Sequence, residues 1–151
     1  MRQVVVRPIA VSDADIIDIH GIRFYKSDMQ SEVIGHPSIM ELSGEEMHIS
    51  DCIIDGSSYN EACIQAGGVK RIYIQRNHIY NCAGPVCYMS NELGTETVDI
   101  SNNYLNNNAT LPKYQWDCTW FGFSKNVGLL QISNNTIVFN STYYQEFFAR
   151  T

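Results

Sequence analysis

Short stretches of alternating apolar and polar residues recur along the chain, each followed by a turn and further apolar positions. The clearest copy runs from Val98 to Leu105, with Val98 and Ile100 before the turn and Leu105 after it. Alternation with a period of two predicts a β-strand, because successive side chains leave opposite faces of a strand. No copy has a helical period, so we expect an all-β chain.

Five copies of this pattern align, near residues 16–24, 46–54, 71–79, 97–105 and 129–137. Their central isoleucines are separated by 30, 25, 26 and 32 residues: Ile19, Ile49, Ile74, Ile100 and Ile132. Recurrence in this range predicts stacked units that bury their apolar faces only against neighbouring units. If each unit contributes one strand in the same direction, the isoleucines lie above one another in a parallel sheet, about 4.8 Å apart.

The turn after the strand carries asparagine in the last three copies, at Asn77, Asn103 and Asn135. Stacked side-chain amides can hydrogen-bond along the stacking axis, and asparagine tolerates the left-handed backbone of a sharp corner. We therefore expect a structural asparagine ladder at this corner. A weaker apolar stretch follows each copy, near residues 39–42, 62–66, 86–90, 120–124 and 144–148, so each unit should have at least two faces.

This pattern resembles the right-handed parallel β-helix of the pectate-lyase-like superfamily, whose short repeats have the form apolar-x-Ile-x-x-Asn-x-apolar. The resemblance covers roughly residues 16–148 and implies a solenoid of about five coils in one domain, residues 1–151. The resemblance also implies a function like that of polysaccharide lyases, polysaccharide hydrolases or phage tailspikes, and a location outside the cell or on a virion surface. A leucine-rich repeat is disfavoured, since the chain has neither a helical segment nor that repeat's leucine signature.

The composition of the chain argues against several classes of binding partner. The net charge of −6 disfavours nucleic acid and anionic membranes. No apolar run approaches 18 residues, and the N-terminus lacks the apolar core of a signal peptide. Neither end has a cap, so we expect a fragment of a longer β-helix or a subunit of a homo-oligomer. The five cysteines lack paired metal-ligand spacing, so we expect buried free thiols, no metal and no cofactor.

The outward positions of the main strands hold the candidate site. Polar side chains on one face, with tyrosine to stack a ring, suit an extended sugar chain, and Trp116 in the longest loop could provide a second stacking surface. Solvated strand residues with no substrate are the alternative. One column reads Asp18, His48, Tyr73, Asp99 and Gln131, and the next reads His20, Ser50, Gln75, Ser101 and Ser133.

Cleavage by two carboxylates is disfavoured on this face. That chemistry needs a separation of about 5–9.5 Å, whereas Asp18 and Asp99 are three repeats apart, about 14 Å. A lyase would instead use His48 as base and Tyr73 as acid, with Arg76, or Lys70 and Arg71, to neutralise the uronate carboxylate. Asp18, beside His48 on the neighbouring strand, could hold the imidazole ring in place.

The competing interpretation of Arg76 is an ion pair with Asp51, one repeat earlier, and we favour that pairing. The expected function is a polysaccharide-binding or polysaccharide-degrading module whose partner is a polysaccharide or oligosaccharide. If the chain is an enzyme, lyase chemistry is favoured over two-carboxylate hydrolysis. The alternative function is a non-catalytic structural or adhesive β-helix fibre segment.

Overall fold

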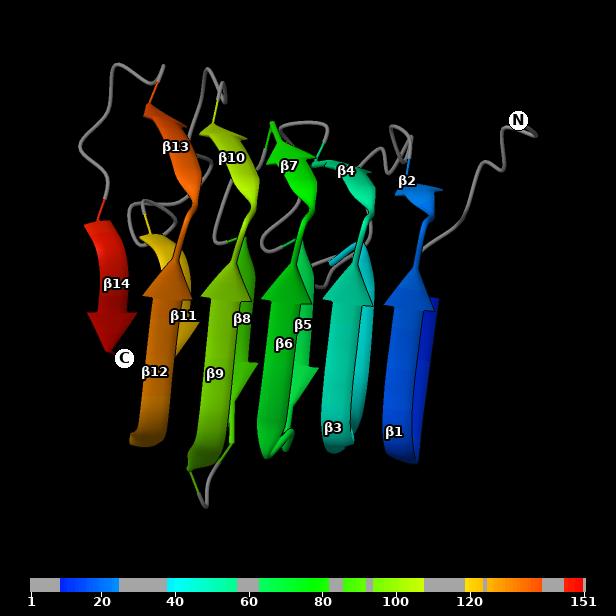
Figure 1. Ribbon diagram of the computed structural model, residues 1–151. Coiled ribbons are helices and arrows are strands. Elements are labelled where there is room, and N and C mark those ends of the chain that lie inside the picture. The colour runs from blue at the N-terminus through cyan, green and yellow to red at the C-terminus, as the bar shows by residue number, and fades with distance from the viewer. Residues whose placement is uncertain are drawn as a thin grey trace, which may run out of the picture.

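A computed structural model describes residues 9–24, 38–56, 63–81, 86–91, 94–107, 119–123, 125–139 and 146–150. Within these ranges the secondary structure is entirely strand, arranged in two parallel sheets (Figure 1). None of the described segments is a helix of the length and apolarity that would cross a membrane.

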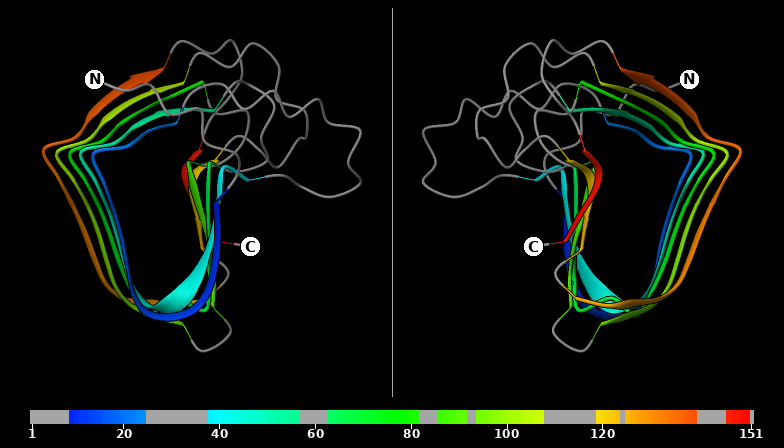
Figure 2. Two further views of the ribbon diagram at one scale, coloured as in Figure 1. Left: turned by 90° about the vertical axis from the view of Figure 1, so that its right-hand side faces the viewer. Right: turned by 90° about the vertical axis from the view of Figure 1, so that its left-hand side faces the viewer.

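The larger sheet has nine strands and curls into a half-barrel, which is visible end-on in Figure 2. Strand β3 (Met40–Ser50) joins its two arms. The first half of β3 pairs with β5 (Ile64–Gly67), and its second half pairs with β6 (Arg71–Gln75). The first arm contains β6 and continues through β9 (Thr95–Ser101) to β12 (Val127–Ser133). The second arm contains β5 and continues through β8 (Cys87–Ser90) and β11 (Thr119–Phe123) to β14 (Glu146–Arg150). Strand β1 (Ile9–His20) pairs with β3 from the other side.

The smaller sheet has five strands, in the order β13 (Thr136–Phe139), β10 (Tyr104–Asn107), β7 (His78–Tyr80), β4 (Ile53–Asp55) and β2 (Arg23–Phe24). Each of them follows a strand of the larger sheet after two residues, as β7 follows β6. The two sheets therefore meet at a corner that the chain turns five times.

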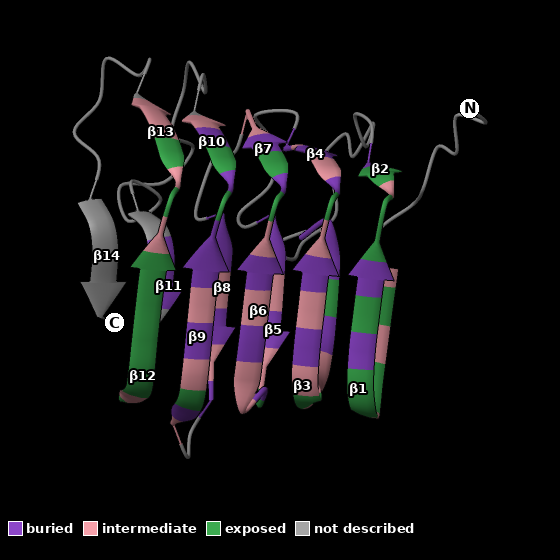
Figure 3. Cartoon of the chain, viewed as in Figure 1, coloured by how far each residue is buried: buried purple, intermediate pink, exposed green. Residues whose placement is uncertain are grey.

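The main-strand isoleucines are in register across the larger sheet. Ile19 pairs with Ile49, Ile49 with Ile74, Ile74 with Ile100, and Ile100 with Ile132. Ile49, Ile74 and Ile100 are fully buried, whereas Ile132 is 39% exposed. The buried positions form bands across successive strands (Figure 3). Truncating a central isoleucine to alanine would cost about 2–5 kcal/mol.

The corner requires a left-handed backbone in every repeat. Its first residue has a positive φ each time: Gly21 (67°), Asp51 (56°), Arg76 (55°), Asn102 (58°) and Asn134 (54°). Glycine adopts this conformation freely, and asparagine and aspartate tolerate it better than other residues. Arg76 is the exception among these five, because a long side chain has no local hydrogen bond with which to stabilise such a backbone.

The second residue of the corner points inward and forms a hydrogen-bonded ladder. The Oδ1 atoms of Asn77, Asn103 and Asn135 accept from the backbone N–H of the preceding repeat, at 3.0, 2.9 and 2.8 Å. Their Nδ2 atoms donate to the carbonyls of Ile49, Ile74 and Ile100 at 2.8, 2.8 and 2.7 Å. These bonds satisfy polar groups that would otherwise be buried unpaired where the strands end.

The structure corrects the predicted fold. We expected a right-handed parallel β-helix solenoid of the pectate-lyase-like superfamily, with separate faces in each of about five closed coils. The described strands instead form two parallel sheets, and one of them is a curled half-barrel. The physical reason is the length of β3: its two halves pair with β5 and β6, so two expected faces belong to one continuous sheet. The segments 25–37, 57–62, 82–85, 108–118 and 140–145 lie outside the described residues.

The structure also corrects the prediction for the cysteines. We expected all of them to be free thiols, but Cys63 is disulfide-bonded, to a partner outside the described residues. Cys52 and Cys87 are free and buried. Burial raises the pKa of both thiols, most strongly for the fully buried Cys87, so neither is poised as a thiolate nucleophile.

Candidate functional site

The outward column of the larger sheet has the register that the sequence pattern requires. Asp18 pairs with His48, His48 with Tyr73, Tyr73 with Asp99, and Asp99 with Gln131. Parallel strands lie about 4.8 Å apart, so these five positions span about 19 Å. Asp18 and Gln131 at the two ends are exposed, and the three residues between them are half-buried.

His48 and Tyr73 form a stacked pair at the centre of this column. Their ring centroids are 4.6 Å apart, and their planes differ by 14°. Glu46 lies two residues before His48 on the same face, and its Oε1 is 2.6 Å from His48 Nε2. A carboxylate can only accept a hydrogen bond, so Nε2 carries the proton, and in a neutral ring the lone pair is on Nδ1. Glu46 therefore fixes the tautomer of His48.

The second oxygen of Glu46 binds a cation. Oε2 accepts a hydrogen bond from Arg71 Nε at 2.6 Å, and Arg71 Nη1 donates to Glu96 Oε2 at 3.3 Å. The bond from Arg71 and, after it, the bond from His48 lower the pKa of Glu46, so this carboxylate is ionised at neutral pH. The side chains are 23% (Glu46), 37% (His48) and 37% (Arg71) exposed, so solvent screens the network. A half-exposed network of this kind orients its members more than it stabilises the fold.

Asp99 has one satisfied and one unsatisfied carboxylate oxygen. Oδ2 accepts from Gln75 Nε2 at 2.7 Å. Oδ1 is shielded from solvent and has no hydrogen-bond partner, and among the described side chains it is the one buried polar atom in that state. Leaving a charged acceptor unpaired costs free energy, and such groups often mark a site that an external donor or ordered water completes.

Arg76 does not lie with His48. It makes a bidentate ion pair with Asp51, with Nε–Oδ1 at 2.9 Å and Nη2–Oδ2 at 2.7 Å. The bond from Arg76 lowers the pKa of Asp51, and His20 Nδ1 lies 3.2 Å from the same carboxylate. The pairing that the sequence favoured is therefore the one that forms, at the corner of the sheet.

The remaining predicted positions separate into three groups. Asp18 and Gln131 lie in the outward column at its exposed ends. His20 lies in the neighbouring column beside Ser50, with Nδ1 3.1 Å from Ser50 Oγ. Trp116 lies outside the described residues.

Sequence reasoning did not identify Glu46 and Glu96, and it gave Arg71 only an alternative role. The signal for Glu46 was present: in a strand, residues i and i+2 share a face, which places Glu46 beside His48. The column through Glu46 also contains Arg71 one repeat later. We had instead assigned Asp18 to hold the His48 ring, and Glu46 is the residue that does so.

The chemistry of this face comes from His48, Tyr73 and Glu46. In the described part of the chain, no three His, Cys, Asp or Glu side chains converge as metal ligands. What the face offers is a stacked pair of rings and an imidazole whose lone pair is fixed on Nδ1.

Comparison of the chain with models of protein families, with curated proteins and with solved structures finds no match. The resemblance to pectate-lyase-like proteins therefore gains no support from relatives, and functional inference for this chain depends on its own geometry.

Proposed function

We propose that the outward face around His48, Tyr73 and Asp99 binds a polysaccharide chain. The observation that carries the proposal is the stacked pair of His48 and Tyr73, half-buried on the outward face with the His48 tautomer fixed by Glu46. A sugar offers a hydroxyl donor for the imidazole lone pair and apolar C–H groups for the aromatic rings. The column of about 19 Å would follow an extended chain rather than a single sugar.

The proposed activity is binding rather than cleavage. Lyase chemistry requires a cation free to neutralise a uronate carboxylate beside the base. Arg76 is occupied by Asp51 at the corner, and Arg71 lies between Glu46 and Glu96. With a net charge of −6 as well, the surface favours a neutral polysaccharide over a polyuronate.

We also propose an extracellular or virion-surface location. The disulfide at Cys63 supports it, because disulfides persist in oxidising compartments and are rare in the cytosol.

Titration calorimetry with neutral and acidic oligosaccharides tests the binding proposal. Cello-, xylo- and manno-oligosaccharides represent the neutral class, and oligogalacturonate the acidic class. We expect one or more neutral oligosaccharides to bind and oligogalacturonate to bind more weakly. Absence of binding by every probe would overturn the proposal, and preferential binding of oligogalacturonate would overturn the neutral assignment.

Matched variants locate the site. Tyr73→Val and Asp99→Asn should each weaken binding about tenfold, which corresponds to about 1.4 kcal/mol. Tyr104→Val is the control, because Tyr104 also contacts a histidine, His78, at a centroid distance of 4.8 Å, but on the smaller sheet. Equal losses for Tyr73→Val and Tyr104→Val would argue against a site on the larger sheet.

A structural or adhesive role is the second candidate, and the exposed strand β12 favours it. Leu129, Leu130 and Ile132 are 56%, 40% and 39% exposed. Apolar side chains at an unpaired sheet edge promote contact with other chains. If this role dominates, sedimentation will show concentration-dependent association that Ile132→Lys abolishes, and every oligosaccharide will fail to bind.

A further inference from the structure

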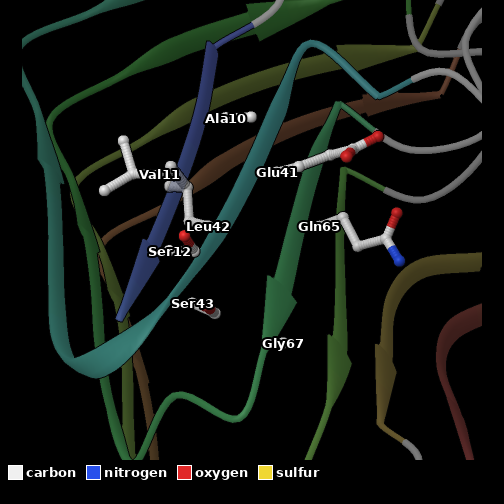
Figure 4. A pocket seen from close by; sticks show the side chains of 8 residues that line it. All are labelled: Ala10, Val11, Ser12, Glu41, Leu42, Ser43, Gln65 and Gly67. Atoms are coloured by element: carbon white, nitrogen blue, oxygen red, sulfur yellow. The ribbon is translucent and has the colours of Figure 1, made fainter. Parts of the chain in front are cut away.

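A depression of about 300 Å³ lies on the other arm of the larger sheet, away from His48 and Tyr73. It spans the first half of β3 and its neighbours β1 and β5 (Figure 4). Its volume is at the lower end of the range for small-molecule sites. Its lining includes Val11, Glu41, Ser43, Gln65 and Gly67.

The depression arises from the order of side chains in two outward columns. Glu41 pairs with Gln65, and both extend away from the side on which Val11 lies (Figure 4). The neighbouring column contains Ser43 and Gly67, whose side chains are too small to fill the space between the strands. Long polar side chains therefore border a floor of small residues.

The two long side chains offer complementary hydrogen-bonding groups. Glu41 is exposed, and the described residues place no cation against its carboxylate, which leaves it free to accept. Gln65 Oε1 accepts from the Ser38 hydroxyl at 3.3 Å, which orients the amide and leaves its nitrogen to donate elsewhere. An acceptor and a donor about one strand spacing apart match two neighbouring hydroxyls of a sugar ring.

An aromatic ring continues the column beyond Gln65. Tyr88 is the next residue in register, and Gly122 follows Tyr88. A Cβ at Gly122 would lie 2.7 Å from Cδ2 and 3.3 Å from Cε2 of Tyr88, so the ring lies over the space that glycine leaves. The ring therefore leans toward β11 and away from Gln65, and Tyr88 is not part of the lining of the depression.

We propose that this depression is a second saccharide site, which binds one neutral pyranose ring through Glu41 and Gln65. The carboxylate disfavours an acidic sugar, and the small volume limits the site to about one ring. This site does not rest on the proposed function of the His48 and Tyr73 face, because none of its residues belongs to that face.

Two-dimensional NMR of the whole chain with simple methyl glycosides tests the proposal. Methyl glucoside, methyl mannoside and methyl galactoside are the probes, and tetramethylammonium tests whether the Glu41 carboxylate prefers a cation instead. We expect a glycoside to shift the side-chain amide of Gln65 and the backbone amide of Gly67 with millimolar affinity. No shift with any glycoside, or shifts with tetramethylammonium alone, would overturn the proposal.

One substitution alters the depression directly. Gly67→Val should fill the floor, because a Cβ at Gly67 would meet just one atom, Ser90 Oγ at 3.8 Å, and its φ is not positive. We expect Gly67→Val to abolish the glycoside shifts at Gln65. Unchanged affinity in Gly67→Val would exclude the depression as the site.

The natural ligand could be a free monosaccharide or the terminal sugar of a longer chain, because both present the same ring. Comparing the affinities of a methyl glycoside and an oligosaccharide distinguishes these two ligands. Binding of an oligosaccharide that is no tighter than the monomer indicates a single-ring site. The two faces are separated by reciprocal variants: Tyr73→Val should leave the Gln65 shifts intact, and Gly67→Val should leave binding to the Tyr73 face intact. If both variants lose both activities, the two sites are not distinct and the inference fails.

Discussion

Asn77 donates two hydrogen bonds to a single oxygen atom of Asn103. Oδ1 of Asn103 accepts from the backbone N–H of Asn77 at 2.9 Å and from its side-chain Nδ2 at 3.1 Å. Asn103 is 2% exposed and Asn77 is 2% exposed, so water cannot replace these bonds. The corner between the two sheets is therefore closed by side chains that each serve two successive repeats.

Asn103→Ala should destabilise the fold strongly. The substitution leaves the N–H of Asn77 and the carbonyl of Ile74 buried without partners. Each unsatisfied group costs about 1–3 kcal/mol, so the free energy of unfolding should fall by about 2–6 kcal/mol. Chemical denaturation measures this change. Asn135→Ala is the control, because Asn135 is only partly buried and water can reach the groups it leaves; a larger loss there would contradict the account.

Cys52→Asn should stabilise the fold. Cys52 occupies the ladder position one repeat before Asn77, and its Sγ lies 3.6 Å from the carbonyl of Ile19. In the later repeats an asparagine Nδ2 donates to the equivalent carbonyl, as Asn77 does to Ile49 at 2.8 Å. Replacing a weak thiol donor by an amide should add about 1 kcal/mol per new hydrogen bond, measured as a raised denaturation midpoint. Cys52→Ser, which cannot reach along the stack, should give no gain.

Asn102 tests the left-handed corner. It has φ 58° and is exposed, so its backbone conformation matters more than its packing. Asn102→Val should lower stability by about 1–2 kcal/mol, because a β-branched residue is disfavoured in this region. Asn102→Gly should be neutral or slightly stabilising. Thermal unfolding of both variants checks the prediction, and equal melting temperatures would contradict it.

These corner residues also show what the sequence could and could not predict. The isoleucine register and the three ladder asparagines follow from a period-two pattern that repeats with one offset, so their positions could be read directly. The curled sheet could not be predicted, because nothing in the pattern shows that Met40–Ser50 forms one continuous strand through Ser43 and Gly44. Gly44 allows it: a Cβ there would lie 2.3 Å from the carbonyl oxygen of Ala14.

The candidate site was only partly predictable for a related reason. Alternation identifies which side chains share a face, so the column through His48, Tyr73 and Asp99 was predictable. It does not show which neighbours pair along or across strands. His48 has two acidic neighbours on its face: Glu46, two residues earlier on the same strand, and Asp18, on the adjacent strand. Glu46 is the one that binds the His48 ring. Such choices depend on rotamers, which the sequence pattern does not encode.

Glu46 should make stability depend on acid pH. Bonds from Arg71 and His48 hold the pKa of Glu46 below its ordinary value of 4.5. The unfolded chain therefore takes up a proton at a higher pH than the folded chain. The stabilisation from Glu46 is complete above about pH 4.5 and is lost as the pH falls through its lowered folded pKa. Denaturation midpoints measured across this range should fall less steeply for Glu46→Gln than for the parent chain.

The charge-matched control for that experiment is Glu45→Gln. Glu45 is 50% exposed and bonds to Lys70 rather than to the His48 and Arg71 cluster, with Oε1 2.9 Å from Nζ. This variant should keep the acid dependence of the parent chain, although it loses the same charge. If both glutamine variants flatten the profile equally, net charge rather than the Glu46 contacts governs the acid response. A difference confined to Glu46→Gln would assign the response to the hydrogen bonds from Arg71 and His48.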